Sequence, residues 1–431
     1  MSGKTYETNP NVTEKAILIS LVTSDDKRKG TDPGQSLAEL AQLTETAGVE
    51  VLTALVQNKE TADTRWFIGK GKVQEVKALA EELGATTAIF DQELSGAQVR
   101  NLEEALDLKI IDRTQLILDI FAGRAKTREG IIQVELAQLS YLLPRLSGHG
   151  KNLSRLGGGI GTRGPGETKL ETDRRHIRKR ISDLKAVLGE VVRHRKLHRE
   201  RRKKNGLVQV ALVGYTNAGK STLLRELTQA DVYVEDQLFA TLDPTSRLLK
   251  LPNGREVILT DTVGFIQNLP HDLVAAFRAT LEEVCEADLV LHVIDSSSPA
   301  RDDQIDVVHR ILEELGASDK PFIKVYNKKD LCGPAGALTN LPVSTGGHLV
   351  ISAYDQEDLE LLLHAIQDKI SGGTVVFNLP AERGDLIALA YRSGEVIGQE
   401  VNEESLKLTV QISAQQYEQH GHQLQPYIDL H

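Results

Sequence analysis

The chain has 431 residues, of which 40% are hydrophobic and 26% are charged, and its formal net charge at pH 7 is −10. This composition is typical of a soluble globular protein, and the length favours roughly two to four domains. Two cysteines cannot form a disulfide framework, no apolar run approaches the roughly 20 residues of a membrane span, and residues 1–6 lack the apolar region of a signal peptide. We therefore expect a cytoplasmic protein without stable membrane insertion.

The first 120 residues alternate between predicted strands and helices. Strands are expected at 16–22, 49–56, 86–90 and 109–112, and helices at 36–46, 73–83 and 95–106. This alternation predicts an N-terminal α/β domain over residues 1–120, with a parallel sheet. Before the second helix, Lys70 and Lys72 alternate with glycines. They either contact a phosphate backbone or lie in a solvated turn, and the sequence leaves both interpretations open.

Residues 121–206 predict a long helical hairpin. Apolar residues recur at positions 132, 136, 139 and 143, before Pro144 ends the first helix, and a second stripe runs from 170 to 191 at heptad-like spacing. The stretch between them, residues 156–167, is rich in glycine. Its Arg163 favours a contact loop over a simple linker.

A concentrated positive charge distinguishes the second helix of this hairpin. Residues 174–204 contain fourteen Lys and Arg against three acidic residues, a net charge of +11, so the remainder of the chain carries −21. A solvated face is one interpretation, but a single basic helix in an acidic chain favours a directed contact with nucleic acid. Together with Lys70, Lys72 and Arg163, the candidate RNA-binding residues are Arg193, Arg195, Arg199, Arg201 and Arg202.

Residues 214–221 fit the phosphate-binding pattern GxxxxGKS between an apolar strand, 207–213, and a helix, 222–227. Glycines let successive N–H groups point at phosphate oxygens, Lys220 reaches the β- and γ-phosphates, and the Ser221 hydroxyl can ligate Mg²⁺. The predicted nucleotide-binding residues here are Gly214, Tyr215, Thr216, Asn217, Ala218, Gly219, Lys220 and Ser221.

Two further segments complete the phosphate end of the predicted site. A DxxG sequence follows the strand 256–260, and we expect Asp261 to hold Mg²⁺ through water and the Gly264 N–H to sense the γ-phosphate. Upstream, Thr241 is predicted to complete the Mg²⁺ shell. With Lys220, we assign catalytic roles to Thr241 and Gly264. The nucleotide-binding residues predicted in the two segments are Phe239, Ala240, Thr241, Leu242, Asp243, Asp261, Thr262, Val263 and Gly264.

An NKxD sequence after the strand 322–326 indicates which base is bound. A carboxylate accepts two hydrogen bonds and donates none, so Asp330 suits the adjacent N1–H and amine donors of guanine. After the strand 349–351, Ser352 and Ala353 lie where a backbone N–H would reach guanine O6. The predicted guanine-binding residues are Asn327, Lys328, Lys329, Asp330, Ser352, Ala353 and Tyr354. These elements predict a GTPase domain over 207–372, followed by a small C-terminal α+β domain, 373–431.

With these parts placed, the chain resembles the HflX family of translational GTPases. The likeness rests on the Phe-Ile-Gly-Lys-Gly-Lys stretch, the glycine loop 157–167, the basic helix and the Phe-Ala-Thr-Leu-Asp segment. It implies GTP hydrolysis with Mg²⁺, binding to the ribosome, chiefly its large subunit and rRNA, and in some members the splitting of stalled ribosomes. Some members are reported to hydrolyse ATP or unwind RNA. Tyr354 departs from the Lys or Arg common at that position. We expect a monomer.

Two other functions remain open at this point. A signalling or membrane-linked GTPase would share the nucleotide core without needing a basic hairpin, and an RNA-binding or RNA-unwinding NTPase would not need NKxD. Phe265 follows DxxG, where Ras-like enzymes carry a Gln that orients water, so we expect slow hydrolysis without a partner. Asn217 could hold K⁺ near the phosphates, which makes K⁺ a candidate second cofactor.

Overall fold

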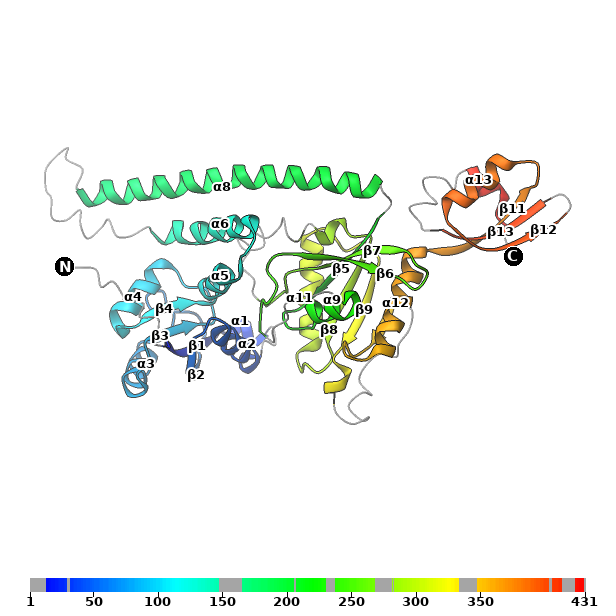
Figure 1. The fold of residues 1–431 in the computed structure, drawn as a ribbon. Coiled ribbons are helices and arrows are strands. Elements are labelled where there is room, and N and C mark those ends of the chain that lie inside the picture. The colour runs from blue at the N-terminus through cyan, green and yellow to red at the C-terminus, as the bar shows by residue number, and fades with distance from the viewer. Residues whose placement is uncertain are drawn as a thin grey trace.

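The computed structural model describes residues 13–28, 32–146, 165–204, 207–229, 237–267, 281, 283–332, 347–402, 405–412 and 423–429. Three separate sheets follow one another along an elongated molecule, with the smallest sheet at the far end from the N-terminal one (Figure 1). The predicted mixed α/β fold class is confirmed. Within the described residues, no helix is both long enough and apolar enough to cross a membrane.

The N-terminal sheet has the strand order β2-β1-β3-β4, and all of its neighbouring strands run parallel. Helices α3 and α4 cover one face, and α2 and α5 cover the other. Seven of the eight residues of β1 are buried, as expected for a strand covered on both faces. The elements are β1 (Lys15–Val22), α1 (Ser24–Arg28), α2 (Pro33–Thr46), β2 (Glu50–Asn58), α3 (Lys70–Leu83), β3 (Thr87–Phe90), α4 (Gly96–Leu106), β4 (Lys109–Asp112) and α5 (Arg113–Arg124).

Side chains at the helix ends explain why these segments begin where they do. Ser95 forms a reciprocal capping box with Gln98 at the start of α4, and the Asp112 carboxylate accepts from the Gln115 N–H at the start of α5. Helix α3 begins at Lys70, three residues before the expected start at 73, so the glycine–lysine stretch lies partly within the helix. We call the elements β1 to α5 the N-terminal unit.

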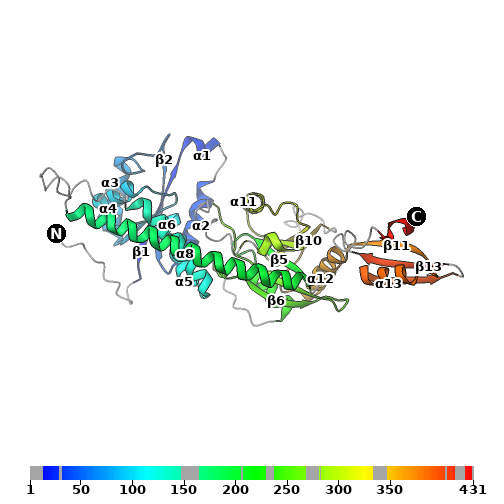
Figure 2. The same ribbon diagram turned by 90° about the horizontal axis from the view of Figure 1, so that it is seen from above.

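The two long helices α6 (Arg128–Arg145) and α8 (Pro165–Lys204) pack side by side as an antiparallel pair on the N-terminal unit (Figures 1 and 2). Buried Ile132 and Leu136 of α6 meet Leu184 of α8. Pro144 does not end α6 as expected but lies inside its last turn. Helix α8 begins at Pro165, the position where a missing N–H costs nothing.

The central sheet has the order β10-β9-β8-β5-β7-β6, in which only β6 runs antiparallel to its neighbour. Helices α9 and α12 cover one face and α11 contacts the other, so the carboxyl ends of β5, β7, β8 and β9 meet at one edge. The elements are β5 (Val208–Gly214), α9 (Lys220–Thr228), β6 (Thr245–Lys250), β7 (Glu256–Asp261), β8 (Leu289–Asp295), α11 (Arg301–Glu314), β9 (Phe322–Asn327), the 3-10 turn η2 (Lys329–Leu331), β10 (His348–Val350) and α12 (Gln356–Ser371).

The C-terminal sheet is antiparallel, with the order β11-β13-β12, and α13 packs on it through the buried residues Leu386 and Ala390. The elements are β11 (Gly373–Pro380), α13 (Gly384–Ser393), β12 (Glu395–Val401), β13 (Ser405–Ile412) and the 3-10 turn η4 (Gln425–Tyr427).

Candidate functional site: a nucleotide pocket at the edge of the central sheet

The loop between β5 and α9 adopts a backbone that requires glycine at both ends. Gly214 has φ of 154°, and a Cβ there would lie 2.2 Å from the Val293 carbonyl oxygen. Gly219 has φ of 94°, and a Cβ there would lie 2.3 Å from Nδ2 of Asn327. The loop therefore closes tightly over the sheet edge and presents the N-terminus of α9 to the pocket, which favours an anion.

Lys220 lies in the first turn of α9 and is 6% exposed. Its ammonium donates to the carbonyl oxygens of Gly214, at 3.2 Å, and Tyr215, at 2.8 Å. Burial lowers the pKa of Lys220 to about 8, and the carboxylate of Asp261 opposes that shift. The lysine is thus held inside the loop by neutral acceptors, where phosphate oxygens would be stronger partners.

Three oxygen-bearing side chains converge beside this lysine. The Ser221 hydroxyl donates to Asp261 Oδ2 at 2.6 Å, and the Thr241 hydroxyl donates to the same Oδ2 at 3.0 Å. The two hydroxyl oxygens lie 2.8 Å apart. Asp261 is fully buried, its Oδ1 has no hydrogen-bond partner among the described residues, and burial raises its pKa. A buried carboxylate with a free oxygen beside two hydroxyls fits a hard divalent cation.

Mg²⁺ suits this set because it usually takes one or two carboxylates together with substrate phosphates and water. Among the described residues, no three His, Cys, Asp or Glu side chains gather as a metal site of their own. Ser221, Thr241 and Asp261 are therefore the residues that would hold Mg²⁺ here, as the sequence predicts, and the ion would neutralise phosphate charge when bound.

The segment after Asp261 lies directly against the phosphate-binding loop. The Thr216 N–H donates to the Phe265 carbonyl at 2.8 Å, and the Phe265 N–H donates to the Gly214 carbonyl at 3.1 Å. A Cβ on Gly264 would lie 2.8 Å from Thr216 Cα and 3.1 Å from Lys220 Nζ. Gly264 therefore sits where a γ-phosphate held by Lys220 would meet its backbone.

Asn327, at the end of β9, joins the two loops of the site. Its Nδ2 donates to the Ala218 carbonyl at 3.0 Å, and its Oδ1 accepts from the Ala353 N–H at 3.0 Å. The side chain is 1% exposed. It thus fixes the phosphate-binding loop relative to the Ser352–Ala353 turn, so the base end and the phosphate end of the pocket keep a constant separation.

The base end is organised by two carboxylates that the sequence motifs do not include. Lys328 pairs with Asp295 of β8 at 2.8 Å. Buried Asp358 of α12 accepts from Lys329 Nζ at 2.6 Å and from the Ser352 N–H at 2.7 Å. Asp330 is exposed in η2, and Tyr354 is 73% exposed. Asp358 therefore ties the NKxD turn to the Ser352 turn, a role that no local pattern signals.

The pocket at the phosphate end is lined by ten of the seventeen residues predicted for that end and by two others. Gln237 and Thr222 were missed by sequence reasoning, because neither belongs to a motif. The lining residues are Thr216, Asn217, Gly219, Lys220, Ser221, Thr222, Gln237, Phe239, Ala240, Thr241, Thr262 and Gly264.

Several predicted nucleotide-binding residues direct their side chains elsewhere. The Tyr215 hydroxyl contacts Glu39 of α2, and the Asp243 carboxylate contacts Thr127 at the start of α6. Leu242 and Val263 are buried in the apolar cluster shared with the N-terminal unit. These four side chains pack between the two parts of the chain, and none of the four residues lines the pocket.

The candidate RNA-binding residues that the structure describes lie on two separate surfaces. Lys70 is exposed and Lys72 pairs with Glu75 at 2.8 Å, both on α3, whereas α8 lies beyond the opposite face of the N-terminal sheet (Figure 1). Arg193 is exposed on α8. Arg163 and the side chains of Arg195, Arg199, Arg201 and Arg202 lie outside the described residues.

The chain matches three family models, described as GTP-binding GTPase N-terminal over residues 34–122, GTP-binding GTPase Middle Region over 124–202 and 50S ribosome-binding GTPase over 209–328. The crystal structure titled SsGBP and GDP complex is similar with a TM-score of 0.45 and 25% identity, and the match covers 82% of this chain and 98% of that one.

Curated relatives match along nearly the whole chain. GTPase HflX of Caldanaerobacter subterraneus subsp. tengcongensis is 52% identical over 93% of this chain and 92% of its own length. GTPase HflX of Escherichia coli is 42% identical, with 93% of each chain covered. The pocket, the guanine-type turn and these relatives lead to one conclusion, which is that the chain belongs to the HflX family of GTPases and hydrolyses GTP.

Proposed function

We propose that the GTP-bound protein binds the ribosome, chiefly its large subunit, and splits stalled ribosomes into subunits. The observation that carries this proposal is the basic helix α8, whose described part exposes Arg175, Lys179 and Lys185 while Leu184 is buried. The family description of residues 209–328 as a 50S ribosome-binding GTPase supports the same target. Positive charge of this kind positions a protein on an RNA backbone without reading its sequence.

The pocket supports hydrolysis that is slow until a partner completes the site. Lys220 holds phosphate oxygens, the Gly264 backbone meets the γ-phosphate, and Thr241 closes over the cation-binding oxygens. Phe265, where a Ras-like enzyme has its water-orienting Gln, is buried beneath α11 and has no group that could bond water. We infer that contact with the ribosome positions the attacking water and so stimulates hydrolysis.

Potassium is a second cofactor that the pocket could hold beside Mg²⁺. Asn217 lines the phosphate end, and its left-handed backbone, with φ of 60°, turns the loop around it. We expect GTP turnover to be faster in potassium than in sodium, and this difference to disappear in Asn217→Ala. Equal rates of the unmutated protein in the two salts would contradict a potassium site.

We also propose that the chain divides into an α/β domain (1–120), a helical hairpin with a glycine-rich loop (121–206), a GTPase domain (207–372) and a small C-terminal domain (373–431). The first two together form the RNA-contacting part. The GTPase domain binds the nucleotide and changes with its state. A GTP analogue and the ribosome then strengthen each other's binding by the same factor, because the linkage between two ligands is reciprocal.

Cosedimentation with large subunits tests the proposal. We expect tight binding with a non-hydrolysable GTP analogue and weak binding with GDP. If α8 neutralises about five phosphates, log affinity falls against log salt with a slope of about −4 to −5, with duplex DNA as guide. Equal subunit affinity in the two nucleotide states would refute the dependence of ribosome binding on the nucleotide, and would favour an RNA-binding NTPase or a signalling GTPase.

Charge neutralisation on α8 separates RNA contact from nucleotide binding. Replacing Arg193, Arg195 and Arg199 by Gln should weaken subunit binding and flatten the salt slope, while the free protein keeps its affinity for GTP. The matched control replaces Arg247 and Lys250, exposed on β6 of the central sheet. An equal loss in the control would show that net charge, and not α8, is responsible.

A further inference from the structure

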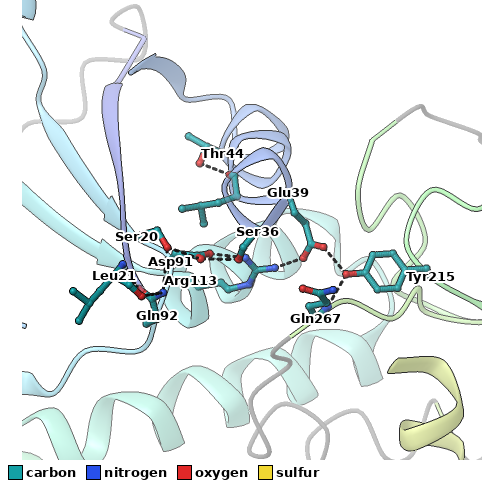
Figure 3. Close-up of polar contacts among 11 residues, drawn as sticks. Ser20, Leu21, Ser36, Glu39, Thr44, Asp91, Gln92, Arg113, Tyr215 and Gln267 are labelled. Atoms are coloured by element: carbon teal, nitrogen blue, oxygen red, sulfur yellow. Dashed lines mark hydrogen bonds and ion pairs between the residues drawn. The ribbon is translucent and has the colours of Figure 1, made fainter. Parts of the chain in front are cut away.

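The N-terminal unit contacts the nucleotide site through Tyr215, the second residue of the phosphate-binding loop. Its backbone carbonyl accepts from Lys220 at 2.8 Å, while its side chain is 5% exposed and packs with the N-terminal unit. The hydroxyl accepts from the Gln267 N–H at 2.8 Å and donates to the Glu39 carboxylate (Figure 3). One side chain thus joins the loop, the segment after Gly264 and helix α2.

Glu39 is held in place by a buried polar network of the N-terminal unit. Arg113, whose side chain is 3% exposed, bonds Glu39 with one nitrogen and Asp91 with the other, the latter at 2.8 Å. Asp91 also accepts from Ser36 at 2.6 Å and Ser20 at 3.2 Å (Figure 3). Elements β1, α2 and α5, together with Asp91 directly after β3, therefore fix where the Glu39 carboxylate points.

A second contact docks the segment around Thr241 on the same side. The Asp243 carboxylate accepts from the backbone N–H groups of Lys126, at 3.1 Å, and Thr127, at 2.9 Å, and from the Thr127 hydroxyl. A Cβ on Gly130 would lie 2.5 Å from Asp243 Oδ1, so only glycine leaves room for this carboxylate. The carboxylate thus sits at the N-terminus of α6, where a negative charge is favoured.

Aromatic packing reinforces this docking. The rings of Phe239 and Phe121 meet edge to face with centroids 4.6 Å apart, and both are buried. Thr241 lies between Phe239 and Asp243 in sequence and reaches Ser221 and Asp261 in the same arrangement. The segment around Thr241 and the segment after Gly264 therefore both contact the N-terminal unit or α6 in the arrangement in which Thr241 bonds Ser221 and Asp261.

We propose that Glu39 and Tyr215 are positioning residues for GTP hydrolysis, which hold the segment after Gly264 in the arrangement that binds the γ-phosphate. GDP lacks that phosphate and gains nothing from this arrangement. A contact present only in the closed arrangement favours GTP over GDP by its own strength. The N-terminal unit thus sets the preference of the pocket for the triphosphate, independently of any ribosome.

Nucleotide affinities of the free protein test this inference. Tyr215→Phe keeps the ring packing but removes the hydroxyl, so we expect the affinity for a non-hydrolysable GTP analogue to fall about tenfold, the strength of one hydrogen bond to a charged group. The affinity for GDP should change less than about twofold, which also shows that the variant is folded. Equal losses for the two nucleotides would overturn the proposal.

A double-mutant cycle shows whether Glu39 acts through Tyr215. Glu39→Ala should lower affinity for the GTP analogue about as much as Tyr215→Phe, and Glu39→Gln, which keeps an acceptor, should recover part of the loss. The double variant Glu39→Ala with Tyr215→Phe should be no worse than either single variant. Glu45→Ala, at an exposed position on the same helix, is the control. Additive losses in the double variant would overturn the pathway through Tyr215.

Discussion

Nucleotide binding should draw a proton onto Lys220 when the solution is mildly alkaline. Burial lowers the pKa of this lysine from 10.5 to about 8, which corresponds to about 3 kcal/mol of penalty on the buried ammonium. Phosphate oxygens within a few ångströms favour the ammonium and raise its pKa again. A lysine with a pKa of about 8 takes up about 0.1 proton per bound nucleotide at pH 7, about 0.5 at pH 8 and about 0.9 at pH 9.

Isothermal titration calorimetry in buffers of different ionisation enthalpy measures this uptake directly. The slope of observed enthalpy against buffer enthalpy at pH 8 should correspond to about half a proton, and affinity should fall about tenfold for each pH unit above 8. An exposed lysine serves as control, so Lys185→Ala should leave the slope unchanged. A slope of zero at both pH 8 and pH 9 would refute the lowered pKa of the buried ammonium.

Three further predictions concern the base site and the sheet core. Asp330→Asn should weaken GTP binding and gain xanthosine triphosphate binding, and an unchanged affinity for GTP in a competition assay would contradict its role. Asp358→Ala leaves the Ser352 N–H unpaired, which costs about 1–3 kcal/mol, so GTP and GDP affinities should fall together by roughly 5- to 150-fold. Glu360→Ala is the exposed control, and a loss confined to GTP would contradict the assignment of Asp358. Burial lowers the pKa of His292 to about 3, so the unfolded chain binds the extra proton first and stability should fall as pH drops below about 6.5, by up to about 1.4 kcal/mol per pH unit. The melting temperature of His292→Gln should depend less on pH between 7 and 5, and an unaltered dependence would count against a neutral buried imidazole.

Most elements of the three sheets could be predicted from the sequence, because their signals are local. An apolar run before a glycine-rich loop marks β5. The apolar residues of α6 and α8 recur every three or four positions, a spacing that is visible within a short stretch of sequence. The boundaries were less accurate where local rules compete. The helix was expected to begin at Val73, after the glycines that flank Lys70, yet it begins at Lys70.

The phosphate-binding and guanine motifs were recognisable because each function depends on residues a few positions apart. Asp358 and Glu39 were not recognisable, because each acts on a partner set by the fold. Asp358 lies six positions from Ser352, but its other partner, Lys329, is 29 positions away, and Glu39 reaches Tyr215 across 176 positions of sequence. The sequence therefore determined by itself that a nucleotide loop follows β5. The packing of α2, α5 and α6 against that loop decided what the side chains of Tyr215 and Asp243 contact, since the partner of a buried polar group is whichever group the core brings within bonding distance.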